Sequence, residues 1–264
     1  MKISIILSTY NRPKALLAVL EAIELQTVKG FEVCIADDGS TSETAQVIEH
    51  FQQQATFPIH HAWQADNGFR AASARNKAVK LSVGDYLLFL DGDCIPRPDW
   101  IQQHISLAET GSFVAGNRVL LDPEITHEIE ERKLRCCDLF GIKLFQHRRH
   151  INRLLPLMRL PLGGLRAIKA TSWEKVRTCN LGVWRKNFIE VNGFDEAYEG
   201  WGFEDSDLAI RLLNSGIHRK LGIFATTVLH LYHREYDRQL TGINRERLEQ
   251  RIRSKVTLPE KGLI

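Results

Sequence analysis

The chain has 264 residues, of which 44% are hydrophobic and 25% are charged, with a formal net charge of +3. This composition is typical of a soluble globular protein, and the length suffices for one large domain or two small ones. No stretch is long and apolar enough to span a bilayer, and the five cysteines form no C-x-x-C pair. We therefore expect a reduced, cytoplasmic protein without a disulfide framework or a zinc site.

Short apolar runs alternate with segments of helical periodicity in the amino-terminal half. Strands are predicted at residues 2–7, 31–36, 58–63, 85–91 and 112–121, and helices at 15–25, 42–53, 71–81 and 97–110. Strands that alternate with helices indicate βαβ units. The sequence thus predicts an α/β fold with a mostly parallel sheet flanked by helices.

The fourth predicted strand ends at two carboxylates, in the motif Asp91-Gly92-Asp93. In open α/β sheets, ligands bind at the carboxyl ends of the strands. Two acids one residue apart, with a glycine between them that lets a ligand come close, suit a hard divalent cation holding phosphate oxygens. Asp-Gly-Asp is also good turn chemistry, so a simple turn is the alternative interpretation.

Polar residues also follow the first two predicted strands, at residues 8–13 and 37–40. A nucleotide-type pocket needs polar groups at this edge of the sheet. The glycine-rich fingerprints of dinucleotide-binding proteins and of P-loop proteins are absent from the sequence. We therefore expect phosphates to be held through a metal ion.

The character of the sequence changes in the middle of the chain. Residues 132–169 contain ten Lys or Arg and a single acid, Asp138, so the rest of the chain is net negative. Prolines and glycines between the leucines of residues 154–165 argue against one long helix. One interpretation is a basic and apolar segment that contacts an anionic membrane surface or an anionic acceptor. The other is a solvated helix face followed by an ordered loop, and binding of nucleic acid is not expected because no recognised module is present.

Acidic and aromatic residues gather in the second half, after a short helix predicted at residues 185–191. Trp201 and Gly202 precede the acids Glu204, Asp205 and Asp207, which begin a helix that extends to residue 213. An aromatic side chain beside carboxylates is a common arrangement for stacking a sugar ring. The alternative is that these acids only complement the dipole of the helix.

Two histidines follow the last predicted strand, at residues 223–229. His230 and His233 are three residues apart in a chain that also carries an Asp-x-Asp motif, which favours metal ligation over a structural role. The tail from residue 234 to 255 is charged, and we expect it to be helical and exposed.

Six motifs in this order and spacing resemble a family 2 glycosyltransferase of GT-A fold, over residues 2–233. The half from Cys179 onward is similar to the galactosyltransferase-like segment of chondroitin-type and animal β-1,4-galactosyltransferases. The motifs are Ser8-Thr9-Tyr10-Asn11, Asp37-Asp38-Gly39-Ser40, Arg70 with Ala74-Arg75-Asn76, Asp91-Gly92-Asp93, Asn192-Gly193-Phe194-Asp195 and Trp201-Gly202-Phe203-Glu204-Asp205.

The resemblance implies a nucleoside-diphosphate sugar as donor, most often with uracil. The donor nucleotide would contact Ser8, Tyr10, Asp38, Arg70, Asp91 and Gly92, with Asp38 accepting a hydrogen bond from the base. Asp93 and His233 would bind Mn²⁺ or Mg²⁺, and His230 is a possible further ligand. Asp205 would be the general base of a single displacement with inversion. Trp201, Gly202 and Glu204 would orient the acceptor sugar.

The sequence departs from the family in two places. The Gln-x-x-Arg-Trp motif of processive membrane synthases is absent, so we expect one or few sugars per encounter. Residues 94–178 carry no family pattern, which leaves the acceptor open. The expected organisation is one catalytic domain, 1–233, with a nucleotide-binding half (1–121), a basic variable segment (122–170) and an acceptor and metal half (171–233). A charged helical tail, 234–264, follows.

The leading hypothesis is a metal-dependent inverting glycosyltransferase that acts on a glycan or lipid-linked acceptor in cell-surface polysaccharide or lipopolysaccharide synthesis. It would be cytoplasmic or peripheral at the inner face of the membrane. One alternative is a module that binds a nucleotide sugar or carbohydrate without catalysis. A sugar-nucleotide pyrophosphorylase is another, but it would need a glycine-rich loop where residues 8–13 contain no glycine.

Overall fold

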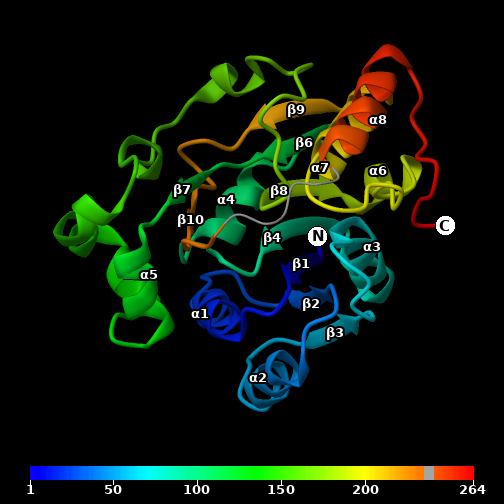
Figure 1. The fold of residues 1–264 in the computed structure, drawn as a ribbon. Coiled ribbons are helices and arrows are strands. Elements are labelled where there is room, and N and C mark those ends of the chain that lie inside the picture. Colours follow the sequence, from blue (N-terminus) through cyan, green and yellow to red (C-terminus); the bar gives the residue numbers. More distant parts are fainter. Residues whose placement is uncertain (235–240) are drawn as a thin grey trace.

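A seven-stranded sheet in the order β3-β2-β1-β4-β8-β6-β9 lies at the centre of the computed structural model, which describes residues 1–234 and 241–264 (Figure 1). The strands from β3 to β4 run parallel, β8 is antiparallel to both neighbours, and β9 is parallel to β6. The predicted α/β fold with a mostly parallel sheet is confirmed. The strands are β1 (Ile3–Thr9), β2 (Glu32–Asp37), β3 (Ile59–Trp63), β4 (Tyr86–Asp91), β8 (Asn180–Trp184), β6 (Ser112–Ala115) and β9 (His218–Leu221).

Helices cover both faces of this sheet, which is why its central strands are continuous apolar runs rather than alternating ones. One core cluster joins the sheet to α1, α2, α4 and α5, and a second joins it to α3, α6 and α7. No helix in the described ranges has the length and apolarity needed to cross a bilayer. The helices are α1 (Pro13–Glu24), α2 (Ser42–Gln52), α3 (Ala71–Leu81), α4 (Trp100–Leu107), α5 (Pro123–Glu130), α6 (Arg185–Glu190), α7 (Glu204–Asn214) and α8 (Thr241–Arg253).

A second sheet of three short strands positions the metal-ligand candidates. Its order is β5 (Cys94–Ile95), β10 (Val228–His230) and β7 (Arg118–Leu120). β10 pairs antiparallel with β5, so that His230 lies opposite Cys94, the residue after Asp93. The backbone N–H of Leu231 donates to the carbonyl of Asp93 at 2.9 Å. This pairing brings two segments that are far apart in the sequence to one point.

Two predicted strands are shorter than the sequence indicated. The run at 112–121 is interrupted at Gly116 and Asn117, and its halves, β6 and β7, belong to different sheets. A Cβ atom at Gly116 would lie 2.2 Å from the side chain of Asn180, so the close approach of these backbones requires glycine. The run at 223–229 is a strand only at its end, because Gly222 to Thr226 forms a turn closed by a bond from the Thr226 N–H to the Gly222 carbonyl.

The basic middle segment contains no long helix, as its prolines and glycines predicted. It forms four 3₁₀ helices, η1 (Cys136–Leu139), η2 (Gly141–His150), η3 (Leu155–Leu157) and η4 (Gly163–Ala167). Leu139 and Leu157 pack into the core, whereas Phe145, Leu155 and Met158 are exposed. The segment is therefore partly anchored in the core and partly exposed.

The described part of the predicted tail contains the expected helix, α8, which is largely exposed but buries three side chains on one face. Residues 235–240 of the predicted tail lie outside the described residues. Asn244, Leu248 and Arg251 of α8 are buried, because α8 packs on α7. The guanidinium of Arg251 contacts Asp207 of α7 at 2.7 Å and Asp195 at 3.2 Å, and both carboxylates are fully buried. Arg211 contacts the other oxygen of Asp207, also at 2.7 Å. The tail thus supplies a cation that neutralises buried acids beneath the start of α7.

Replacement of Arg251 by alanine should destabilise the protein by about 3–5 kcal/mol, because it leaves two buried carboxylates short of a cation. Urea unfolding of the full chain measures this free energy. Arg253→Ala, on the exposed side of the same helix, should change stability by about 0.5 kcal/mol or less. Equal stabilities of the two variants would contradict the role assigned to the tail.

Candidate active site

A cavity of about 340 Å³ lies where the carboxyl ends of β1 and β4 face the start of α7. It is lined by residues of the amino-terminal half and of the segment after residue 176. All predicted site residues except Arg70 line it: Ser8, Tyr10, Asp38, Asp91, Gly92, Asp93, Trp201, Gly202, Glu204, Asp205, His230 and His233. The tertiary structure therefore brings the donor, metal, acceptor and base candidates to one place.

Asp93, His230 and His233 form a cluster that fits one metal ion. The Nε2 atoms of His230 and His233 each lie 3.6 Å from a different carboxylate oxygen of Asp93. One ligand atom from each residue can be chosen so that all three lie within 4.8 Å of one another. A carboxylate with two imidazoles suits Mn²⁺ better than Mg²⁺, which prefers oxygen ligands.

Different contacts act on the two histidines. The Nδ1 atom of His233 lies 2.7 Å from the backbone carbonyl of Arg234. Because a carbonyl can only accept, Nδ1 donates this hydrogen bond, which orients the ring. Burial lowers the pKa of His230, although Asp93 acts in the opposite direction.

Arg12 is a site residue to which the sequence analysis assigned no role. Its guanidinium donates to Asp93 at 2.9 Å and to Glu130 of α5 at 2.8 Å, and it lines the cavity. The sequence feature that could have identified Arg12 as a site residue is its position in the polar turn directly after β1. Arg12 therefore places a fixed positive charge beside the metal-ligand cluster.

Arg75 is the second such residue, and it connects the two halves of the site. Its guanidinium contacts Asp91 of β4 at 3.1 Å and Glu204 of α7 at 3.0 Å, and it donates to Ser8 at 3.2 Å. The side chain is 6% exposed. Burial by itself would lower the pKa of Arg75, but Asp91 and Glu204 outweigh it and raise the pKa. The charge of Arg75 thus stays fixed while it orients both carboxylates.

Asp205 is a carboxyl group of the cavity whose surroundings raise its pKa. Its pKa is raised to about 6, first by burial and then by the negative charge of Glu204. Arg177, with Nε 3.9 Å from an oxygen of Asp205, partly offsets this rise. Phe203, just before these acids, has a left-handed backbone with φ of 77°. A strained residue of this kind is often found beside a functional group that must be aimed into a site.

Asp38, predicted to contact the donor base, lines the cavity and accepts two hydrogen bonds. Its carboxylate accepts from the Gln64 side chain and from the backbone N–H of Arg70, both at 2.6 Å. Arg70 is the N-cap of α3, and its guanidinium donates to the carbonyl of Ala65. Arg70 does not line the cavity, and it contacts Asp38 through its backbone N–H. Tyr10 donates to Asp66 at 2.9 Å, at the mouth of the same pocket.

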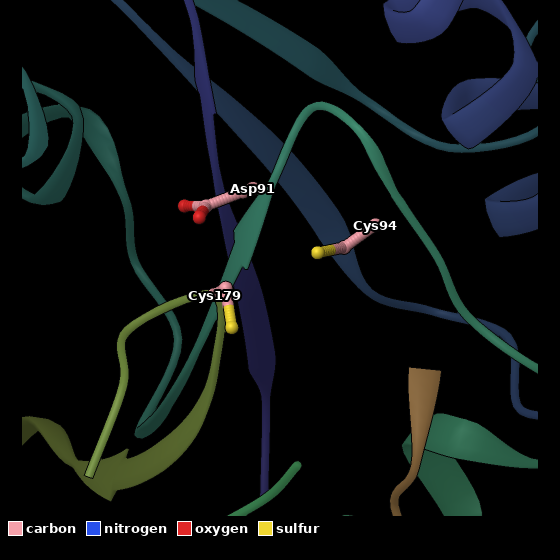
Figure 2. Close-up of side chains that lie close together, drawn as sticks. All are labelled: Asp91, Cys94 and Cys179. Atoms are coloured by element: carbon pink, nitrogen blue, oxygen red, sulfur yellow. The ribbon is translucent and has the colours of Figure 1, made fainter. Parts of the chain in front are cut away.

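Asp91, Cys94 and Cys179 also lie close together (Figure 2), and Asp91 and Cys179 line the cavity. Asp91 is already paired with Arg75, and burial raises the pKa of the Cys94 thiol well above its usual value. Neutral thiols are poor metal ligands. Cys34, Cys94 and Cys179 are buried thiols.

Comparisons with known proteins agree with this geometry. A family model described as glycosyl transferase family 2 matches residues 4–175. The chain belongs to glycosyltransferase family 2. A second model, described as the N-terminal domain of galactosyltransferase, matches residues 167–234, which include α7, β10 and both histidines. The resemblance stated from the motifs is confirmed.

Curated relatives of this family 2 chain include validoxylamine A glucosyltransferase of Streptomyces hygroscopicus subsp. jinggangensis. It is 29% identical over 81% of this chain and 52% of its own length. Chondroitin synthase of Escherichia coli is 25% identical over 82% of this chain and 33% of its own length. The chain thus spans about half or less of the length of these relatives.

Solved structures similar to this family 2 chain have the GT-A fold. The mannosyltransferase PcManGT of Pyrobaculum calidifontis, in complex with GDP-Man and Mn²⁺, superposes with a TM-score of 0.63 at 15% identity, over 96% of this chain and 64% of that one. TarS 1–349 of S. aureus, in complex with UDP, gives a TM-score of 0.62 at 16% identity, over 96% and 65%. The predicted GT-A fold is confirmed.

Replacement of Glu204 by glutamine should lower the pKa of Asp205, because it removes the negative charge that opposes ionisation of its neighbour. The carboxyl ¹³C chemical shift of Asp205, followed through a pH titration, measures this pKa directly. In the unaltered chain the midpoint should lie at about 6. Glu199→Gln, at an exposed position, should leave the midpoint unchanged. An Asp205 midpoint insensitive to Glu204→Gln would show that the two carboxyl groups are not coupled.

Proposed function

We propose that this chain is a metal-dependent, inverting glycosyltransferase that moves a sugar from a nucleoside-diphosphate sugar, a UDP-sugar, to a hydroxyl of a glycan or lipid-linked acceptor. The observation that carries the proposal is that a metal-ligand cluster and a carboxyl group with a raised pKa line the same cavity. A cation binds the leaving diphosphate in such a reaction, and a base activates the acceptor. A module that only binds sugars would not need a perturbed carboxyl group.

Asp93, His233 and His230 would hold the cation, with Mn²⁺ preferred over Mg²⁺ from the ligand set. When bound, the ion supplies Lewis-acid stabilisation to the diphosphate leaving group. Arg12 lies against Asp93 and adds a second positive charge on this side of the cavity. The solved neighbour with bound Mn²⁺ supports a divalent metal.

The donor nucleotide would lie along the ends of β1, β2 and β4. Asp38, Ser8, Tyr10, Asp91 and Gly92 line this part of the cavity and offer hydrogen-bonding groups for a base and a ribose. Solved neighbours in complex with UDP and with GDP-Man support a nucleotide-sugar donor. A Cβ atom at Gly92 would lie 2.8 Å from the carbonyl of Ser8, so the Asp-x-Asp turn can pack against β1 only with glycine at this position.

Asp205 would take the proton of the acceptor hydroxyl as that oxygen attacks the anomeric carbon from the face opposite the diphosphate. Above a pH of about 6 its carboxylate is ionised and can accept this proton. Trp201 lines the cavity and is 37% exposed, so its ring is accessible for packing on an acceptor sugar. Glu204, held by Arg75, would orient the acceptor through its second carboxylate oxygen.

The acceptor would belong to cell-surface polysaccharide or lipopolysaccharide synthesis, in the cytoplasm or at the inner face of the membrane. Relatives named chondroitin synthase and hyaluronan synthase support a glycan acceptor. The free buried thiols are compatible with a reducing compartment.

Replacement of Asp205 by asparagine should lower the rate of transfer by a factor of about 10²–10⁴, because a carboxylate base contributes this much. Release of UDP from a set of UDP-sugars, with acceptor and Mn²⁺ present, measures the rate, and calorimetry measures donor binding. Donor affinity should be retained. Asp85→Asn, at an exposed position outside the cavity, should behave as the unaltered chain. Near-normal transfer by Asp205→Asn would contradict the assignment of the base.

Replacement of His233 by alanine should weaken binding of Mn²⁺ by at least about tenfold, because one of three protein ligands is lost. Isothermal titration of the full chain with MnCl₂, without any sugar nucleotide, measures this affinity. His218→Ala removes an exposed histidine of β9 and should leave it unchanged. Equal affinities of the two variants would exclude His233 as a ligand.

A further inference from the structure

We propose that the outer face of residues 139–158 docks on an anionic lipid bilayer and takes acyl chains into an apolar cavity beneath it. This surface, here the basic-apolar face, comprises η2, η3 and their connecting loop. The proposal goes beyond the transfer reaction and does not rest on it, because neither the metal-ligand cluster nor Asp205 takes part.

The first observation is a cavity of about 530 Å³ within this segment. It lies outside the candidate active site, with which it shares no lining residue. Arg97 provides the one charged side chain in its wall and donates to the carbonyl of Leu157. The lining residues are Arg97, Leu139, Phe140, Gly141, Leu144, Phe145, Leu154, Leu155, Leu157 and Met158. An apolar cavity of this kind suits a hydrocarbon chain and offers little to a sugar or a phosphate.

The second observation is that large apolar side chains at the rim of this cavity point into solvent. Phe145 and Leu155 are each 60% exposed, and Met158 is 51% exposed. All three also line the cavity. Single exposed apolar residues are ordinary, but a group of them around an apolar cavity marks an interaction surface.

The third observation is the charge of the same segment. Arg148, Arg149 and Arg153 are exposed. Outside residues 132–169 the chain carries net negative charge, so the positive charge is local to this segment. Basic side chains that flank exposed apolar ones match the two layers of an anionic membrane surface, its headgroups and its acyl chains. The apolar cavity favours a lipid surface over a nucleic acid, which would contact the charge alone.

The basic-apolar face is connected to the candidate active site through α5. Ile151 bridges to Leu121, and His150 contacts Asp122, the N-cap of α5, at 2.8 Å. At the other end of α5, Glu130 contacts Arg12. Figure 1 shows the segment after α5 running along the outside of the molecule. A membrane on this face would therefore lie beside the cavity and not across it.

Co-sedimentation of the full chain with vesicles tests the proposal. Vesicles of phosphatidylcholine with phosphatidylglycerol should bind the chain, binding should weaken as salt is raised, and vesicles of phosphatidylcholine alone should bind it much more weakly. Absence of binding to the anionic vesicles, or equal binding to both kinds, would overturn the proposal. Binding to a polyanion such as RNA without binding to vesicles would identify the charge as a nucleic-acid surface and also overturn it.

Two variants separate the contributions of charge and of the cavity. The pair Arg148→Glu and Arg149→Glu, and separately the pair Phe145→Ser and Leu155→Ser, should each weaken vesicle binding by about tenfold or more. Matched controls on and after α3 are the exposed pairs Lys77→Glu with Lys80→Glu, and Leu81→Ser with Val83→Ser. These controls should bind as the unaltered chain does, and thermal melting confirms that every variant is folded.

The pattern of losses decides the outcome. Loss of binding in the charge pair alone would exclude insertion of acyl chains, and equal losses in the controls would exclude this face. Transfer to a water-soluble acceptor should be unaffected by either pair. A failure of vesicle binding can thus be distinguished from a failure of the proposed catalytic function.

Discussion

The site depends on the contacts that the buried guanidinium of Arg75 makes with three other elements. Arg75 lies on α3 and contacts Ser8 of β1, Asp91 of β4 and Glu204 of α7, so it joins the nucleotide half to the acceptor half. Without a cation between them, Asp91 and Glu204 would be two partly buried acids facing one cavity, and each would be costly to keep ionised. The planar fork of arginine suits this position, because one side chain can satisfy several acceptors in different directions.

The same principle of paired buried charge recurs on the far side of α7. Asp207 has the Arg211 and Arg251 guanidinium groups at its two oxygens, and Arg251 also reaches Asp195. The start of α7 is thus held from inside the cavity by Arg75 and from behind by α8. A helix fixed at both sides can aim Asp205 into the cavity. Burial and the negative charge of Glu204 keep the pKa of Asp205 above its usual range, although Arg177 partly offsets them.

The metal-ligand cluster depends on a different constraint, the pairing of β10 with β5. That pairing sets His230 opposite the residue after Asp93, and the chain then turns so that His233 approaches the other carboxylate oxygen. Three ligands from two segments can converge because backbone hydrogen bonds, which are insensitive to side-chain identity, set the register. The metal-ligand cluster is therefore positioned by strands. The basic segment that lies between these strands in the sequence is not needed for the cluster and can form a different surface.

The sequence by itself determined the features that depend on local pattern. Continuous apolar runs predicted β1, β2 and β4 because a strand buried on both faces needs them, and polar residues at their ends predicted the edge at which Asp38, Asp91 and Asp93 lie. Only the tertiary structure decided which partners the long charged side chains take. Arg12 and Arg75 line the site, and Arg251 of a tail expected to be exposed is buried, because their partners lie on other elements. It also decided the break between β6 and β7, since the close contact of Gly116 with Asn180 exists only after the two sheets have packed.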